Sequence, residues 1–162
     1  MCGIGKRFSD AGFINHKSMI EVFGQNMLER VINKFMSINV FLITTHKIEK
    51  QLRMNSKWNE LRKKIEIIFI EDHKLGPAYS IYKAFNYIPK KIGTYISYCD
   101  ITWEWSKESF VKEDTEAAIF CHYGFHPHLV NNNFSAFCKP EKNNYKKLNK
   151  IKEKESFTND WM

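Results

Sequence analysis

Short apolar runs alternate with longer charged segments through the first hundred residues. Asn39–Thr45 (NVFLITT) and Ile65–Glu71 (IEIIFIE) are short, β-branched and aromatic, as buried strands tend to be. The charged stretch between them, His46–Lys64, predicts helix or a mixture of loop and helix. A third run, Thr94–Cys99 (TYISYC), predicts a strand that ends directly before Asp100.

Apolar side chains recur at helical spacing just before the first of these runs and just after the second. They are Met27, Val31, Ile32 and Phe35 in the first case, and Ile81, Phe85 and Ile88 in the second. Strand and helix therefore alternate along this half. That order predicts an α/β fold with βα units around a mostly parallel sheet.

The pattern changes after Asp100. Glu116–His122 and Phe134–Cys138 predict strands, and Trp105–Lys112 predicts one short helix, so a mixed or antiparallel part is expected to follow the parallel sheet. The segment Lys139–Lys154 holds seven Lys against two Glu. Such a run is compatible with a nucleic-acid patch, but a solvated loop and edge strand is the more common explanation.

Length and composition narrow the class of protein. A chain of 162 residues has room for one domain, since domains take roughly 100 to 200 residues. The hydrophobic fraction of 43% and the aromatic fraction of 15% allow a packed core and exclude intrinsic disorder. With 25 Lys and Arg against 18 Asp and Glu, the net charge of +7 favours an anionic partner: nucleic acid, anionic lipid or a phosphorylated small molecule.

Cysteine spacing and hydropathy bear on the compartment. The four cysteines form no C-x-x-C pair, which argues against a zinc knuckle or a disulfide framework. No apolar stretch reaches the roughly 18 residues of a membrane span, and the N-terminus lacks the apolar run of a signal peptide. These features predict a soluble, cytoplasmic protein.

The N-terminal sequence MCGIGKRF combines two glycines with two cations. Backbone N–H groups of a glycine-rich turn can approach a phosphate while a nearby cation offsets its charge. The wider segment, residues 3–24, resembles the signature loop of the sugar-phosphate nucleotidyltransferases, which have a Rossmann-like GT-A fold. The resemblance implies that Gly3 and Gly5 contact the nucleotide phosphates and that Arg7 and Lys17 act in catalysis by neutralising their charge.

Two further motifs resemble that family. Leu75-Gly76-Pro77-Ala78 resembles its G-[TP]-A turn, which implies nucleotide binding by Gly76 and Ala78; an ordinary helix start with Pro at its first position is the alternative. Asp100, after the run SYC, resembles the aspartate that holds the catalytic Mg²⁺. A helix cap or turn residue is the alternative, although ligands of open α/β sheets do bind at strand ends.

The second half resembles a narrower bacterial subgroup associated with surface-polysaccharide synthesis. The matching segments are YCD up to Asp100, Trp105, YGFHPH over 123–128, and EKESFT over 153–158. The resemblance implies that Glu153 and Lys154 contact the sugar-phosphate acceptor, with an ordinary surface position as the alternative for Lys154. His126-Pro127-His128 is better interpreted as acceptor-pocket or structural than as zinc-binding, since no third ligand is adjacent.

Some features depart from the family pattern. Asn15 and His16 stand where a proline-containing lead-in usually precedes the lysine. The family's glycine loop follows a buried first strand, and its domain continues to a second metal-binding aspartate. We therefore expect residues 1–162 to be a single partial nucleotidyltransferase domain.

The expected reaction is transfer of a nucleoside monophosphate from an NTP to a phosphorylated acceptor, with Mg²⁺ as cofactor and without a nucleic-acid or membrane partner. One alternative is a GT-A glycosyltransferase, whose D-x-D motif is not met because Ile101-Thr102 follow Asp100. Another is a basic nucleic-acid-binding module, which the charge supports but no recognisable binding motif does.

Overall fold

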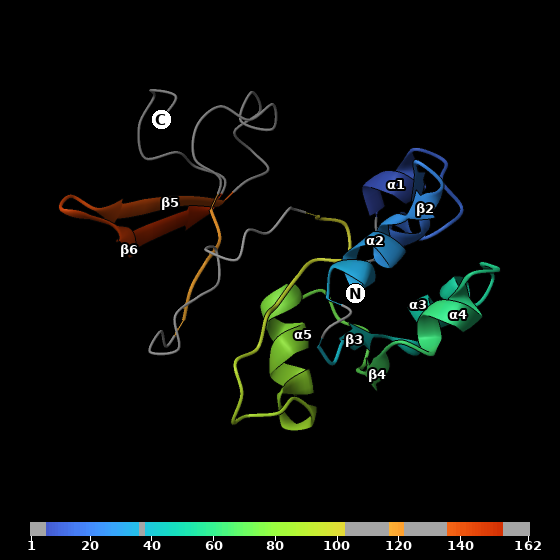
Figure 1. Ribbon diagram of the computed structural model, residues 1–162. Coiled ribbons are helices and arrows are strands. Elements are labelled where there is room, and N and C mark those ends of the chain that lie inside the picture. The colour runs from blue at the N-terminus through green and yellow to red at the C-terminus, as the bar shows by residue number, and fades with distance from the viewer. Residues whose placement is uncertain (1–5, 36–37, 103–116, 122–135, 154–162) are drawn as a thin grey trace. The chain divides into compact units, whose positions relative to one another are not determined.

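The computed structural model describes residues 6–35, 38–102, 117–121 and 136–153. The chain divides into two compact units, Met1–Trp105 and Ser106–Met162, each of which is described by itself. Over the described residues the fold is mixed α/β, with five α-helices and three two-stranded sheets (Figure 1). The expected α/β class is therefore confirmed, while a single partial domain stays a prediction.

The N-terminal part of the first unit consists of short elements joined by tight turns. They are helix α1 (Lys6–Asp10), the 3-10 helix η1 (Lys17–Met19), and strands β1 (Glu21–Val22) and β2 (Gln25–Asn26). The two strands pair antiparallel. The turn between them has positive φ at both central residues, 51° at Phe23 and 76° at Gly24, as tight two-residue hairpins of type I′ require.

Helix α2 (Met27–Lys34) follows β2 directly. Asn26 caps the helix, because its side-chain oxygen accepts a hydrogen bond from the backbone N–H of Glu29 at 2.7 Å. The buried side chains of the helix are Leu28, Val31 and Ile32. The helix predicted from apolar spacing is confirmed.

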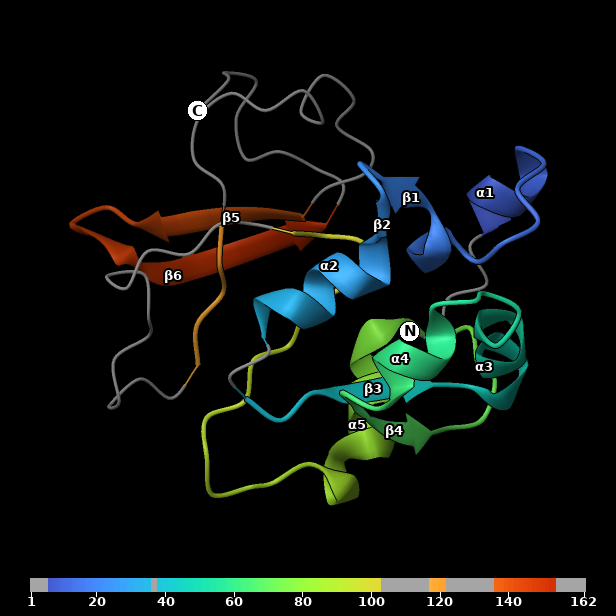
Figure 2. The same ribbon diagram turned by 45° about the vertical axis from the view of Figure 1, so that its right-hand side comes forward.

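A parallel pair of strands forms the centre of the unit. Strands β3 (Phe41–Thr44) and β4 (Glu66–Phe69) pair over their whole lengths, and Figure 2 shows them side by side. The connection between them contains helices α3 (His46–Leu52) and α4 (Trp58–Arg62). Both predicted strands and the charged helical connection are confirmed, and parallel pairing through a helical crossover is the βαβ arrangement that the element order predicts.

The core forms between this parallel pair, its crossover helices and α2. Leu52 and Trp58 are its most completely buried large side chains, at 0% and 1% exposure. The buried cluster consists of Met19, Leu28, Ile32, Leu42, Ile48, Leu52, Trp58, Leu61 and Ile65. Cys99 packs against this cluster from the segment that leads to Asp100.

Helix α5 (Pro77–Ala84) and the 3-10 helix η2 (Phe85–Tyr87) follow β4. The helix occurs where it was predicted, but its buried residues are Ser80 and Ala84 rather than the expected apolar stripe, and Phe85 is 54% exposed. Small side chains on the buried face let a helix approach its neighbour closely.

The predicted strand Thr94–Cys99 is not found, because this segment has no regular secondary structure. A strand needs a neighbour that supplies N–H and C=O partners, and within the described residues β3 and β4 pair only with each other. The Tyr and Ile side chains of the segment accordingly remain largely exposed, 56% at Tyr98 and 66% at Ile96.

The second unit contains the antiparallel pair β5 (Ala136–Glu141) and β6 (Asn144–Glu153). Strand β5 confirms the strand predicted near Phe134–Cys138 over its described residues, and most of the Lys-rich run forms β6. The strand predicted for Glu116–His122 is not found in its described part, because residues 117–121 have no regular structure. The helix predicted for Trp105–Lys112 lies outside the described residues. Among the helices that the structure describes, none has the length and apolar character to cross a bilayer.

Candidate functional site

An ion pair joins two residues that the resemblance assigns to one nucleotide site. The Lys17 Nζ lies 2.5 Å from the Asp100 Oδ2, although the residues are 83 positions apart in the sequence. The two side chains keep 26% and 31% of their surface exposed, so the pair lies at the surface of the first unit and a ligand can reach it.

The turn that carries Lys17 is held by buried contacts. His16 caps η1: its Nδ1 accepts a hydrogen bond from the backbone N–H of Ser18 at 3.3 Å and contacts the Ser18 hydroxyl at 2.8 Å. His16 and Ser18 are buried, and Met19 belongs to the core. The turn is therefore anchored on both sides of Lys17, and His16, which departs from the family's lead-in, serves as the cap.

Asp100 is positioned by the residue before it. Cys99 packs against the core, so the chain is fixed where Asp100 turns toward Lys17. Burial raises the pKa of the Cys99 thiol above its usual value, and the neighbouring negative charge of Asp100 raises it further. Cys99 is thus a protonated packing residue at neutral pH.

The carboxylate and the ammonium of this ion pair are the kinds of group that can bind Mg²⁺ and a triphosphate, respectively. Among the described residues there is no cluster of three or more His, Cys, Asp or Glu side chains that could hold a metal. Mg²⁺, however, is commonly held by one or two carboxylates, with water and substrate phosphates as its other ligands. Asp100 can provide one carboxylate, because only its Oδ2 contacts Lys17 in the structure. The Lys17 ammonium contacts this same carboxylate in the structure.

Gly76 has a conformation that requires glycine. Its φ of 84° and ψ of 177° lie in a region that residues with a Cβ rarely adopt, and it stands at the N-cap of α5 with Pro77 as the first helical residue. No side chain caps the helix there, and no heavy atom lies within 4 Å of the position that a Cβ would take. The turn therefore leaves open space at the start of the helix, next to the exposed Ala78.

The other predicted site residues are only partly described. Arg7 belongs to helix α1, and Glu153 ends β6 in the second unit, opposite Ala136. Gly3, Gly5 and Lys154 lie outside the described residues, as does His126–His128. Their predicted roles stay predictions. Of the expected site residues that the structure describes, it brings Lys17 and Asp100 into contact.

Sequence reasoning missed a polar pocket beside α2. Gln25, Arg30, Asn33, Lys34 and Thr102 line this pocket. One clue was available, since Arg30 and Lys34 are spaced by four residues and such pairs share one face of a helix. The participation of Thr102, far away in the sequence, had no such clue.

No family model matches the chain, and neither the curated proteins nor the solved structures include a significant match.

Proposed function

We propose that this chain is a nucleotidyltransferase domain that transfers a nucleoside monophosphate from an NTP to a phosphorylated acceptor, a sugar phosphate, with release of pyrophosphate. We place it in the cytoplasm, in nucleotide-sugar supply for surface-polysaccharide synthesis. The observation that carries the proposal is the contact between Lys17 and Asp100, 83 positions apart, which the resemblance to the family assigns to one nucleotide.

The proposed reaction is a direct displacement. An oxygen of the acceptor phosphate forms a bond to the α-phosphorus of the NTP while the bond to the leaving pyrophosphate breaks, so the protein itself need not form a covalent bond. Lys17 and Arg7 stabilise the negative charge on the phosphates, and positioned cations are the main source of rate acceleration in such a step. Mg²⁺ held by Asp100 would neutralise further phosphate charge and orient the triphosphate.

The remaining roles follow the resemblance. Gly3 and Gly5 give their backbone N–H groups to the phosphates, and the open turn at Gly76 and Ala78 accommodates the nucleotide base. Glu153 and Lys154 contact the acceptor. The parallel β3–β4 pair with its helical crossover supports the proposal, since we take it as part of a Rossmann-like GT-A sheet.

Two alternatives have less support. A GT-A glycosyltransferase would use a D-x-D motif, and Ile101-Thr102 follow Asp100 instead. A nucleic-acid-binding module would draw on the lysines of β6, but Lys147 is paired with Glu141 at 3.1 Å, as expected for a solvated strand. Neither alternative accounts for the contact between Lys17 and Asp100.

The test is release of pyrophosphate from each of the four common NTPs with a panel of hexose 1-phosphates in the presence of Mg²⁺. We expect one pair of substrates to react, and Lys17→Gln to lower the rate by about 10²-fold or more, as loss of a group that stabilises transition-state charge does. Lys50→Gln, which removes the same charge from the exposed face of α3, should leave the rate unchanged. Absence of pyrophosphate release with every pair, or equal effects of the two substitutions, would overturn the proposal.

A further inference from the structure

A pocket of about 340 Å³ lies beside helix α2, outside the Lys17–Asp100 pair. Its volume is at the low end of the range of small-molecule sites. The lining residues that the structure describes are all polar: Gln25, Arg30, Asn33, Lys34 and Thr102. Two of these described residues, Arg30 and Lys34, are cations and none is a carboxylate, so this part of the lining favours an anion.

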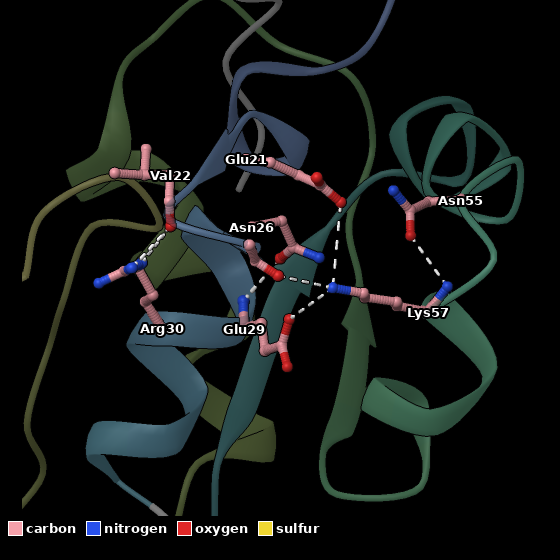
Figure 3. A network of polar contacts seen from close by, with 8 residues as sticks. Glu21, Val22, Asn26, Glu29, Arg30, Asn55 and Lys57 are labelled. Atoms are coloured by element: carbon pink, nitrogen blue, oxygen red, sulfur yellow. Dashed lines mark hydrogen bonds and ion pairs between the residues drawn. The ribbon is translucent and has the colours of Figure 1, made fainter.

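Arg30 is held in place before any ligand binds. Its Nε and Nη2 donate hydrogen bonds to the Val22 carbonyl oxygen at 3.1 and 2.6 Å, as Figure 3 shows, and its guanidinium lies 5.9 Å from the centre of the Phe23 ring. These contacts use two of the three guanidinium nitrogens and leave Nη1 for another acceptor. A side chain that is already ordered loses little conformational entropy on binding a ligand.

No carboxylate among the described residues forms an ion pair with either cation of the pocket. The nearby carboxylates of Glu29 and Glu21 lie 3.8 and 3.9 Å from the Lys57 ammonium, which also donates to the Gly24 carbonyl oxygen at 2.9 Å (Figure 3). Lys34 is exposed, and no acidic side chain among the described residues forms an ion pair with it. Within the described part of the chain, the carboxylates around the hairpin thus contact Lys57, and neither of them pairs with Arg30 or Lys34.

The other polar groups that line the pocket are suited to phosphate oxygens. Asn33 also lines the pocket, and its amide carries an NH₂ group that can donate to a phosphate oxygen. The amide of Gln25 and the hydroxyl of Thr102 add further donors. Guanidinium, ammonium and amide donors together can satisfy several oxygens of a dianion, and charge-assisted hydrogen bonds are the strongest of these interactions.

We propose that this pocket binds the phosphate group of a small phosphomonoester. Two cations match the charge of a phosphomonoester dianion, and the volume leaves room for a short polar body next to the phosphate. The site shares no residue with the Lys17–Asp100 pair, and its existence does not rest on the proposed transferase function.

The experiment is an NMR titration of ¹⁵N-labelled protein with glycerol 3-phosphate, with glycerol as the uncharged counterpart. We expect saturable shifts of backbone amides in residues 25–34 and at Thr102 with the phosphate alone. Lys34→Gln should weaken binding about tenfold, because one charge-assisted contact of about 1.4 kcal/mol is lost. Lys34 is exposed, so this substitution should leave the fold intact, and Lys50→Gln on α3 is the matched control.

A second variant separates the pocket from the nucleotide site. Asp100→Asn should leave the glycerol 3-phosphate shifts unchanged. Saturable shifts confined to the surroundings of Lys17 and Asp100 would overturn the pocket and leave the proposed function standing. Equal affinities of the Lys34 and Lys50 variants, or shifts that do not saturate, would overturn the pocket as well.

Discussion

Replacing Gly76 by alanine should destabilise the protein through the backbone alone. The φ of 84° and ψ of 177° at this position are rarely accessible to a residue with a Cβ, and such strain costs about 1–3 kcal/mol. No heavy atom lies within 4 Å of the place that the alanine Cβ would occupy, so a steric clash adds nothing. Alanine also lowers the conformational entropy of the unfolded chain, which stabilises the folded protein by about 0.4–1 kcal/mol. The net loss in the free energy of unfolding should be about 1–2 kcal/mol.

Gly93 is a matched control. A Cβ at Gly93 also meets no heavy atom within 4 Å, but the φ of this residue is not positive. Gly93→Ala should therefore leave the stability unchanged or raise it slightly, since the restriction of the unfolded chain is not opposed by strain.

Urea unfolding followed by circular dichroism measures both variants. With a slope m of about 2 kcal/mol/M, the midpoint of Gly76→Ala should fall by roughly 0.5–1 M at unchanged m, while that of Gly93→Ala should stay or rise. Equal midpoints of the two variants would refute the conclusion that the turn before α5 requires glycine.

Three further predictions concern other parts of the chain. A double-mutant cycle of Lys17→Met and Asp100→Asn, measured by unfolding, should give a coupling energy below about 1 kcal/mol, because the ion pair is partly exposed. A coupling energy of several kcal/mol would show that the ion pair stabilises the fold. Cys121 is an exposed residue, but partial desolvation of its thiol, followed by the hydrogen bond with Cys138 and the charge of Cys138, raises its pKa to about 11. Its alkylation by iodoacetamide should therefore be slow at neutral pH and should accelerate as the pH approaches 11 and the thiolate forms. Fast alkylation at pH 7 would contradict this prediction. Filter binding of RNA and DNA across a salt series should show weak binding. If the Lys-rich run bound nucleic acid, the logarithm of the binding constant would instead fall with the logarithm of the salt concentration, with a slope of about −0.7 to −0.9 per phosphate contact.

The elements that were predictable from the sequence are those with local causes. The runs NVFLITT and IEIIFIE are apolar and β-branched over short lengths, and both contain strands, β3 and β4. Helix α2 was predictable from its apolar spacing, and Asn26 at its N-cap is a residue type that commonly begins helices. The parallel pairing followed from the order of strands and helices.

The features that could not be predicted depend on distant parts of the chain. Thr94–Cys99 has the composition of a strand, but strand formation also needs a partner, which composition does not reveal. The contact between Lys17 and Asp100 cannot be derived from spacing, because nothing local selects one cation out of 25 Lys and Arg. The resemblance to a family assigned both residues to one site, whereas the pocket at Thr102 became visible only from the fold.

Calorimetric titration of the chain with an NTP, in the presence and absence of Mg²⁺, tests the nucleotide site most directly. We expect tighter binding with Mg²⁺, and we expect Asp100→Asn to remove most of that difference, because the variant lacks the carboxylate that holds the cation. Asp72→Asn, which changes an exposed carboxylate in the same unit, should retain the Mg²⁺ dependence of the unaltered chain. Equal Mg²⁺ dependence in the Asp100 variant and the unaltered chain would contradict the assignment of the metal to Asp100, and with it the proposed site.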